Sequence, residues 1–599
     1  MSIRQYVLLA LMGLAALPFT TSRAGAAEEA APVAAHIKLS GDLDETPVSS
    51  DPLFGGAAEN FKSKLDRIHK AAKDDAVKAL YLEIDGVTMG WGKLDELTRA
   101  IAEFRKTGKK AFAYMEGGDA KEYLLATSCN EIGVPESGWI MLTGVRAEVS
   151  FYKDLLDKIG VKADILRMGE AKSAAESYTQ TKMSEASHKQ LEGVLDDFYE
   201  NSMVGRIVKN RTEKKFTAEQ VKKIIDNGPY AAHAAEKAGL IDRVAYQKDF
   251  EESFKETLKV DNVAITRNYG QAKSEELDLS SPFAIFKLMA PSKEAFSSKK
   301  SKIAVIYATG VINTGKSSES FFGESSCGSQ TMITALRQAE NDKTVKAIVL
   351  RVDSPGGSAL ASDLIWAEVV RCKKPVIASM SDVAASGGYY IAMPAQKIIA
   401  EPGTITGSIG VFGGKMALEG VYEKIGIHTE VISRGANAGI FSSTFPFSPS
   451  EKEAMTALIH DAYDQFLDKA VAGRTKAGVK ITRKQLEAIA GGRIWTGRQA
   501  KENGLVDQLG NLDDAVAAAK KVAGVGEGKD LELLILPKPR SFIDMLLDAK
   551  SETRAPMMQL LPLLREAPEL APKLRGLEGF LRMRGEPVWL MEPCQIRVR

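Results

Sequence analysis

The sequence repeats itself once, with an offset of 265 to 268 residues between the two copies. VKALYLEID at 77–85 resembles VKAIVLRVD at 345–353. Three further pairs follow in the same order: LTGV 142–145 with SIGV 408–411, KIGVKADILRMG 158–169 with KIGIHTEVISRG 424–435, and AEKAGLID 235–242 with AKENGLVD 500–507. Matches in constant order and at nearly constant spacing predict two tandem homologous domains, near 35–250 and 301–525.

Each copy alternates short apolar runs with amphipathic stretches. In the second copy the runs are almost uninterrupted and rich in β-branched residues, as in parallel strands covered on both faces; they lie at 302–309, 346–352, 375–380 and 397–401. The stretch 360–371 has helical apolar spacing. This alternation predicts an α/β fold, with parallel sheets flanked by helices and joined by right-handed crossovers.

The first 26 residues have the features of an export signal. Arg4 supplies a positive start, 6–16 form an apolar run, and Ala-Gly-Ala at 24–26 resembles a cleavage site. The run is shorter than the roughly 20 residues that span a membrane. An uncleaved membrane anchor is the alternative interpretation. In both cases the bulk of the chain is expected to be exported.

Two other segments lie outside the predicted repeats. Residues 251–300 are mainly polar around a short apolar patch, PFAIFKLM, and are expected to form a linker. The C-terminal extension, 526–599, is rich in leucine, proline and charged residues, and is expected to form helices. The sequence indicates no role for it.

The composition argues against nucleic-acid and metal binding. The 79 basic and 78 acidic side chains nearly cancel, without a long basic run, so electrostatic binding of nucleic acid is not expected. The four cysteines lack CxxC spacing, so a metal site is not expected from them: Cys129, Cys327, Cys372 and Cys594. No cofactor is expected either. Disulfides are permitted in an exported protein, but the spacing indicates no pairing.

The second copy contains a serine in an unusual setting. Ser386 follows a predicted strand and precedes two glycines, at what resembles the first turn of a helix. Free backbone N–H groups at such a turn, that of Gly387 first, can stabilise an oxyanion. Gly356 and Gly357 of VDSPGGS follow another strand, and without side chains their N–H groups can approach a ligand closely.

The first copy lacks these features. At an offset of 266 residues, Ala120 takes the place of Ser386 and Lys121 that of Gly387. The stretch equivalent to VDSPGGS reads IDGVTMG, without the Pro-Gly-Gly turn. Only the second copy therefore carries a candidate nucleophile and an oxyanion loop.

The candidate base lies in the first copy. No histidine occurs in 382–392, whereas Lys172 aligns with Ala438, so the copy without the serine carries the lysine. This complementarity predicts one composite Ser-Lys site across the two domains. A lysine can act as a base when burial away from carboxylates lowers its pKa. Its small neighbours at 173–175 are compatible with burial, but Glu170 and Glu176 must point away.

Each motif by itself has an ordinary structural interpretation. Ser-Gly-Gly and Pro-Gly-Gly are usually tight turns, and a single lysine is usually a solvated surface residue. The distribution of these motifs between the two copies is what favours the catalytic interpretation.

The motifs DSPGGS, AASGGYY, TGSIGVFGG and GEAKSA resemble those of the signal peptide peptidase A family, in its long duplicated form also called protease IV. The resemblance covers about residues 35–525. It implies an α/β fold related to the Clp protease subunit and the crotonases. It also implies Ser386 as nucleophile, Lys172 as base, and Ser408 as a residue that contacts and orients the lysine amine, although Ser408 could equally be a turn residue.

The resemblance further implies a homotetramer on the periplasmic side of the cytoplasmic membrane that degrades signal peptides after export. The chain departs from the family in its cleavable-looking N-terminal run and its unmatched C-terminal extension, so the mode of membrane attachment stays open. The near-neutral charge offers no field to steer charged partners, so apolar peptides are the expected substrates.

Two other functions compete with a peptidase. A crotonase-like enzyme would share the fold and the Gly-Gly loop, but its acyl-CoA substrate is cytoplasmic, and it would not explain Ser386 with Lys172. A catalytically inactive membrane scaffold would not need both residues and the oxyanion loop. The peptidase is therefore the favoured hypothesis.

Overall fold

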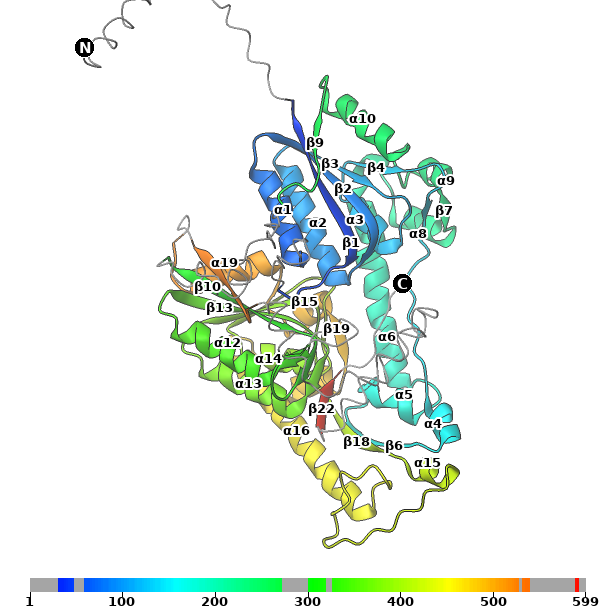
Figure 1. Cartoon of the computed structure of the whole chain (residues 1–599), viewed down its shortest axis with the longest axis vertical. Helices are drawn as coiled ribbons and strands as arrows, with labels where there is room; N and C mark the ends of the chain where they lie inside the picture. The colour runs from blue at the N-terminus through cyan, green and yellow to red at the C-terminus, as the bar shows by residue number, and fades with distance from the viewer. Residues whose placement is uncertain are drawn as a thin grey trace, which may run out of the picture.

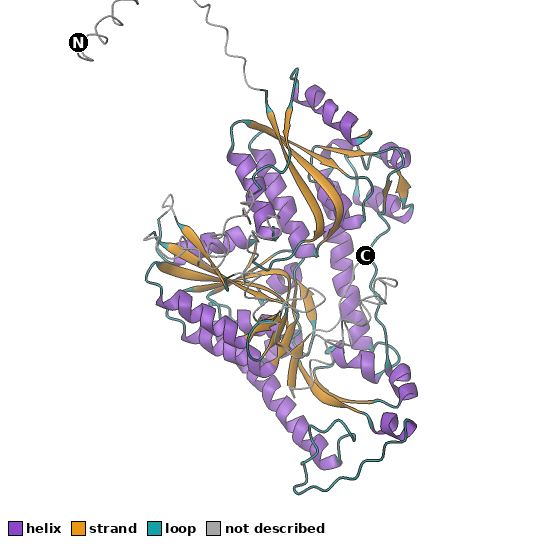
Figure 2. Cartoon of the chain, viewed as in Figure 1, coloured by secondary structure: helices purple, strands orange, loops and turns teal. Residues whose placement is uncertain are grey.

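Two parallel sheets, one in each repeat, form the cores of the computed structural model (Figures 1 and 2). The structure describes residues 31–47, 59–271, 300–318, 326–526, 531–538 and 588–591. The predicted signal at 1–26 lies outside these ranges. In the described ranges, no helix is long and apolar enough to cross a membrane.

The N-terminal sheet has six strands, all parallel to their neighbours. Their spatial order is β8 (Arg243–Val244), β4 (Glu131–Val134), β3 (Lys110–Tyr114), β2 (Val77–Thr88), β1 (Val33–Asp42) and β9 (Ala264–Thr266). The apolar side chains of three helices pack with one face of the sheet: α1 (Phe61–Lys73), α2 (Trp91–Lys106) and α3 (Ala120–Ala126). On α10 (Gln247–Leu258), Phe250 and Phe254 are one helical turn apart and pack with Phe112 of β3.

The C-terminal sheet follows the same plan. Its order is β19 (Ile494–Thr496), β17 (Ile405–Gly407), β15 (Val376–Ala385), β13 (Val345–Ser354), β10 (Lys302–Thr309) and β21 (Glu532–Leu536); β16 (Lys397–Ala400) pairs with β15 and with β20 (Gln508–Leu509). Only β17 and β19 pair antiparallel among these described strands. The predicted runs at 302–309, 346–352, 375–380 and 397–401 are thus confirmed as strands, and 360–371 as a helix.

Helices cover the C-terminal sheet as well. Four pack into one core cluster: α12 (Ser329–Asn341), α13 (Ala359–Arg371), α14 (Gly387–Ala392) and α16 (Pro449–Lys476). A separate cluster joins α19 (Leu512–Val522) to the sheet. The helix α16 begins sharply because Ser448 and Glu451 form a capping box and Pro449 occupies the first turn.

The two sheets match strand for strand, which confirms the predicted α/β fold of two tandem repeats. The order β8-β4-β3-β2-β1-β9 corresponds to β20-β16-β15-β13-β10-β21.

The last strand of each set lies beyond the domain boundary expected from the sequence. The N-terminal domain continues through α10 and β9, where a linker was expected from 251, and β21 belongs to a tail that was expected to be helical. Both edge strands are held by pairing with β1 or β10.

A third sheet joins the two repeats. Its order is β12 (Ser326–Gly328), β11 (Val311–Asn313), β14 (Gly356–Ser358), β22 (Val588–Met591), β18 (Val411–Ala417) and β6 (Lys162–Met168). β6 comes from the N-terminal repeat and pairs antiparallel with β18 of the C-terminal repeat along seven residues. The third sheet therefore brings the segment that follows β6 into the C-terminal domain (Figure 1).

Shorter elements complete the described fold. They are β5 (Trp139–Ile140) and β7 (Tyr230–Ala231), α4 (Lys153–Ile159), α5 (Glu176–Thr179), α6 (Glu185–Asp197), α7 (Gly205–Asn210), α8 (Ala218–Asp226), α9 (Ala232–Lys237), α15 (Glu419–Lys424), α17 (Arg483–Ile489) and α18 (Gly497–Glu502), with 3-10 turns at Ser173–Ala175 and Thr212–Lys214 and a π-helical stretch at Phe198–Val204.

A buried cation on α2 anchors the N-terminal domain to two segments of the C-terminal domain. Lys93 Nζ lies 2.7 Å from Asp353 Oδ2 and 2.8 Å from Asp382 Oδ2. Burial raises the pKa of Asp353 to about 6. Burial alone would lower the pKa of Lys93, but Asp353 and Asp382 raise it well above its usual value. Asp353 precedes the glycine loop and Asp382 precedes Ser386, so this cation fixes both segments relative to α2.

Candidate active site

Ser386 occupies a strained turn between β15 and α14. Its φ of 56° and ψ of −113° are unusual for a residue with a side chain, and such strain is found at functional sites. Its N–H donates to the Gly407 carbonyl at 2.8 Å, and its own carbonyl accepts from the Tyr390 N–H at 2.8 Å. The side chain is fully buried. The turn predicted from Ser-Gly-Gly therefore exists and is held from both sides.

In the N-terminal repeat, side chains cap the equivalent helix N-terminus. Asp119 caps α3 by accepting the Glu122 N–H, and Glu122 reaches back to the Asp119 N–H in a capping box. Ala120, the equivalent of Ser386, is the first residue of that helix. The first repeat thus uses its helix N-terminus for capping.

Lys172 reaches the C-terminal domain at the end of β6. Arg167 donates to the Lys172 carbonyl at 3.1 Å, and the Ala171 N–H donates to the Gly491 carbonyl at 2.9 Å. Gln190 donates to the Ala171 carbonyl at 3.0 Å. A methyl group on Gly492 would lie 2.4 Å from Lys172 N, so this close approach requires a glycine. Residues on both domains therefore fix the backbone that carries the lysine.

The structure brings Lys172, Ser386 and Ser408 together. Lys172 Nζ lies 2.8 Å from Ser386 Oγ and 2.8 Å from Ser408 Oγ, and it donates to the Ser408 carbonyl at 3.1 Å. All three side chains are completely buried. Ser408 also has a positive φ, 51°, and its N–H donates to the Arg493 carbonyl at 2.7 Å. The three residues were named from separate parts of the sequence, and they meet here in hydrogen-bond geometry.

The two acidic neighbours of Lys172 are accounted for. Glu170 is exposed at the surface. Glu176 is buried, and its carboxylate accepts from Arg167 at 2.6 Å and from the Ser184 N–H at 3.1 Å. Burial alone would raise the pKa of Glu176, but the hydrogen bonds from Ser184 and Arg167 lower it.

The three candidate oxyanion glycines adjoin one another beside Ser386. A methyl group on Gly387 would lie 3.1 Å from Gly357 N and from Gly356 Cα, and one on Gly356 would lie 2.6 Å from Gly387 N. Gly356 has a φ of 98°, and its N–H donates to Ser354 Oγ at 3.1 Å. Gly356 and Gly357 belong to strand β14, where the sequence indicated only a turn.

Sequence reasoning missed several residues around this site. Arg167 donates to the Lys172 carbonyl and Gln190 to the Ala171 carbonyl. Trp589 of the C-terminal extension packs with Ala174 and Phe412 in a small apolar cluster. Arg167 and Gln190 belong to no recognisable sequence motif, so the sequence offered no signal for them. The apolar stretch VWLM, 588–591, was the available signal for a strand at Trp589.

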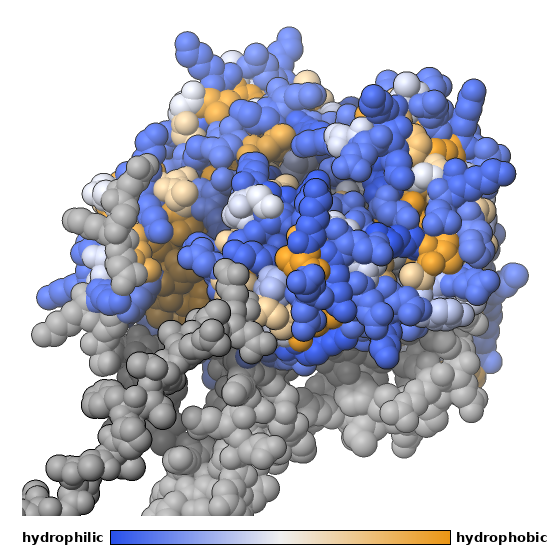
Figure 3. All heavy atoms as spheres, turned by 90° about the horizontal axis from the view of Figure 1, so that it is seen from above, coloured by the Kyte–Doolittle hydropathy of each residue, from blue (hydrophilic) through white to orange (hydrophobic). Residues whose placement is uncertain are grey.

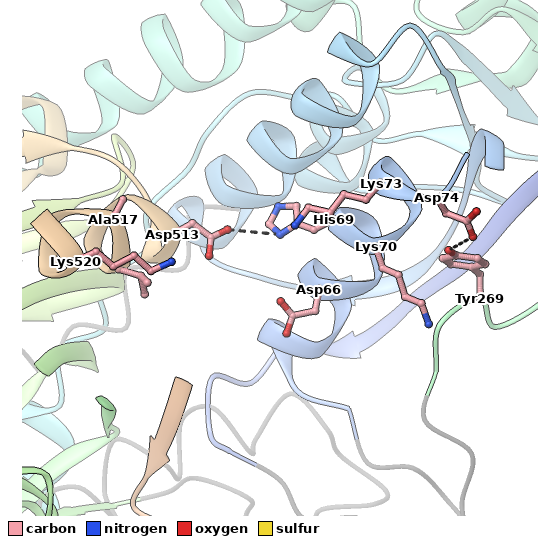
Figure 4. Close-up of a pocket in the computed structure, with 10 residues that line it drawn as sticks. Asp66, His69, Lys70, Lys73, Asp74, Tyr269, Asp513, Ala517 and Lys520 are labelled. Carbon is pink, nitrogen blue, oxygen red and sulfur yellow. Dashed lines mark hydrogen bonds and ion pairs between the residues drawn. The ribbon is translucent and has the colours of Figure 1, made fainter. Parts of the chain in front are cut away.

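The molecule has a cleft of about 740 Å³ elsewhere, between α1 and α19 (Figure 4). It is lined mainly by charged side chains, and His69 faces Asp513 across it at 3.5 Å (Figure 4). It contains none of the predicted site residues. The face of the protein in Figure 3 is mostly hydrophilic, with apolar residues in separate patches.

Comparison with known proteins defines the class. The chain is a serine peptidase built from two copies of one α/β domain. It belongs to peptidase family S49, whose sequence model matches residues 103–261 and again 368–526. The favoured hypothesis of a peptidase of the long, duplicated form is thus confirmed.

Two relatives match most of the chain. The chloroplastic serine protease SPPA of Arabidopsis thaliana is 37% identical over 484 residues, which cover 80% of this chain and 68% of the relative. Protease 4 of Salmonella typhi is 31% identical over 531 residues, 86% of this chain and 81% of the relative. Among solved structures, a ClpP1 point mutant from Listeria monocytogenes is 16% identical, with 35% of this chain and 94% of that chain covered and a TM-score of 0.23.

Proposed function

We propose that the protein hydrolyses peptides with Ser386 as nucleophile and Lys172 as general base. The observation that carries this proposal is the 2.8 Å distance between Lys172 Nζ and Ser386 Oγ. Ser386 Oγ attacks the carbonyl carbon of the scissile bond while Lys172 takes the hydroxyl proton. Lys172 then gives this proton to the departing amine, and water hydrolyses the acyl-enzyme with Lys172 again as base.

A neutral amine matches the contacts of Lys172. It has two N–H donors for the carbonyl and hydroxyl of Ser408, and one lone pair to accept the Ser386 proton. Complete burial of the side chain favours the uncharged form of an amine. We therefore assign Ser408 as the positioning residue for the lysine.

None of the six histidines, all of which lie in the described ranges, hydrogen-bonds to Ser386, and five of them lie near carboxylates, which supports the lysine as the base. His36 pairs with Glu83 of β2, and His428 is exposed at the surface. The other four lie near carboxylates elsewhere: His69 near Asp513, His188 near Glu192, His233 near Glu136 and His460 near Asp464.

For the oxyanion we propose the N–H groups of Gly387 and Gly357. Gly387 directly follows the nucleophile, and Gly357 N lies beside it. The Gly356 N–H already donates to Ser354 Oγ, so we do not assign it as an oxyanion donor. Gly356 contributes to the site through its positive φ and its lack of a side chain.

For the substrate we propose extended apolar peptides, including signal peptides left after export. Beside the lysine segment, a small pocket is lined by five apolar side chains, those of Val149, Phe151, Met183, Leu191 and Ile494, and by five polar ones, those of Ser173, Glu176, Ser177, Ser187 and Gln190. The apolar part of this lining supports apolar side chains of a peptide as ligands. With the export signal expected at 1–26, this supports a site of action on the periplasmic side of the cytoplasmic membrane.

We also propose that copies of the chain assemble through a strand pairing that repeats the β6–β18 joint. At the offset of 266 residues, β18 corresponds to 145–151 and β6 to 428–434. Neither segment forms a ladder with the described residues. Residues 145–151 alternate between half-buried and exposed, as a strand would, and 428–434 expose Val431 and Ile432, the latter by 90%.

Transferring the β6–β18 register places Val145 opposite Arg434 of the next copy, and Phe151 opposite His428. The two surfaces differ, so the contact is head-to-tail and must close into a ring to avoid a filament. A ring of four is the expectation from the family resemblance.

The test is hydrolysis of an apolar fluorogenic peptide by the full chain and by Ser386→Ala. The change removes one oxygen and should leave the melting temperature unchanged while abolishing turnover. A Ser386→Ala protein that keeps full activity at matched purity would remove the basis of this proposal.

A further inference from the structure

The hydroxyl of Ser354 holds the glycine loop beside the nucleophile. It accepts the Gly356 N–H at 3.1 Å and donates to the Gly310 carbonyl at 2.6 Å. The Ser354 side chain is completely buried. Ser354 therefore ties the loop that carries the proposed oxyanion donor, Gly357, to the residue that follows β10.

In the N-terminal repeat a carboxylate holds the equivalent loop. Val87, which stands in the place of Pro355, donates its N–H to Glu122 Oε1 at 2.7 Å. The other oxygen of Glu122 accepts the Asp119 N–H at 2.9 Å. Because Glu122 is the third residue of α3, this carboxylate lies at the turn where the C-terminal repeat has its nucleophile.

The C-terminal repeat holds its loop without a carboxylate. Pro355 has no N–H, so the donor that the N-terminal repeat pairs with its carboxylate is absent from this residue. The next N–H of the loop, that of Gly356, binds the Ser354 hydroxyl, whereas the N-terminal repeat has Gly86 in the place of Ser354. A neutral hydroxyl within the loop thus replaces a negative charge that would repel an oxyanion beside Ser386.

We propose that Ser354 is a positioning residue of the oxyanion site. This inference rests on the proposed function, in which the N–H groups of Gly357 and Gly387 stabilise the oxyanion. The Ser354 hydroxyl fixes the peptide group before Gly356, whose φ of 98° then brings Gly357 N beside Gly387. Two successive glycines do not restrict their own backbone, so this hydrogen bond is needed to hold the donor in one direction.

The first experiment compares Ser354→Ala with the wild type in hydrolysis of an apolar fluorogenic peptide, below the melting temperature of both. The variant should lower kcat by about 10- to 100-fold and leave KM unchanged, because only the transition state carries the oxyanion. The pH profile of kcat/KM should keep its shape, since Lys172 and Ser386 are untouched.

Two further variants serve as controls. Ser354→Thr keeps the hydroxyl and should retain most of the activity. Ser253→Ala removes another buried hydroxyl, which donates to the Phe250 carbonyl at 2.6 Å on α10, and should leave kcat unchanged.

Binding of two matched ligands separates a positioning role from a structural one. A peptide aldehyde adds the Ser386 hydroxyl and places its oxygen at the oxyanion site, whereas the peptide alcohol of the same sequence binds without this step. Ser354→Ala should weaken binding of the aldehyde by about the same factor as kcat and leave the affinity for the alcohol unchanged. Equal weakening of both ligands would show that Ser354 serves only the fold, and it would overturn the inference.

The kinetics can also overturn the inference without the proposed function. Wild-type kcat in Ser354→Ala would do so, as would a folded Ser354→Thr protein as slow as Ser354→Ala; in both cases the proposed function stands if Ser386→Ala is inactive. Full activity in Ser386→Ala would instead overturn the proposed function.

Discussion

Lys172 Nζ lies 2.8 Å from Ser408 Oγ, the same distance that separates it from Ser386 Oγ. The amine is thus held between the proposed nucleophile and a second serine with a φ of 51°. This second contact fixes where the lone pair of a neutral amine points, and it leads to the first prediction.

Ser408→Ala should lower kcat by about 10- to 100-fold, because a buried amine loses one hydrogen-bond partner. The pH profile of kcat/KM should also shift, since the partner of the base has changed. Ser408→Gly is the matched control: it relieves the positive φ but also lacks the hydroxyl. Equal losses in both variants are expected. Normal activity in Ser408→Gly would show that Ser408 serves only the turn.

Gly357→Ala should reduce turnover by about 10²–10³-fold, the usual cost of losing an oxyanion donor. The added methyl would lie 2.0 Å from the Ile312 carbonyl oxygen, so β14 must move. Gly193→Ala is the control, because a methyl there meets nothing within 4 Å. Steady-state kinetics should show the effect in kcat more than in KM. Unchanged turnover in Gly357→Ala would remove this strand from the oxyanion site.

Lys93→Met should destabilise the protein by about 3–5 kcal/mol, because it leaves Asp353 and Asp382 buried without their cation. The pKa of Lys93 is raised in the folded protein. The stability that the charged Lys93 gives the folded state is therefore complete at neutral pH, and it is lost only as the pH rises through that raised pKa. In the variant, protonated carboxyls need no cation, so the loss should be smaller at pH 5 than at pH 8.

Chemical denaturation at both pH values measures this effect. Lys153→Met, at an exposed pair with Asp157, is the control and should change stability little. A Lys93→Met protein as stable as the wild type at pH 8 would show that the buried cation is dispensable for the domain junction.

A cysteine pair tests the proposed assembly. Transfer of the β6–β18 register places Glu148 opposite Val431 of the next copy. Glu148→Cys with Val431→Cys should therefore form intermolecular disulfides under mild oxidation, seen as a ladder on a non-reducing gel. Glu148→Cys with Ile425→Cys is the control: six residues along a strand move the partner by about 20 Å, beyond disulfide reach. Equal cross-linking of both pairs, or of neither, would contradict this register.

The long elements of the fold were predictable from sequence because each carries its own pattern. β10 and β13 are continuous apolar runs, buried on both faces, and the internal repeat fixed their equivalents in the first domain. The short strands β9, at a sheet edge, and β22, inside the third sheet, were not predicted. Three or four residues such as AIT or VWLM have no periodicity, and they become strands only because β1, β14 or β18 offers hydrogen bonds.

The candidate site, like the fold, was predictable from the sequence only in part. Ser386 and Lys172 could be named because each is missing from the other repeat, and Ser408 followed from the family resemblance. Their meeting at 2.8 Å depends on β6 crossing to β18, which no local pattern encodes. Arg167 and Gln190 act through backbone carbonyls, and such contacts depend on tertiary structure alone.

The most direct test of the central claim is the rate at which a serine-reactive phosphonate labels the protein, followed by intact mass as a function of pH. Wild type should take up one label on Ser386, with a rate that rises along a single ionisation below about 10.4, the value of a free lysine. Lys172→Met and Lys172→Arg should be labelled about 10²–10⁴-fold more slowly, because neither offers a neutral amine. A Lys172→Met protein labelled on Ser386 as fast as the wild type would contradict the account, because the serine would then be activated without the lysine.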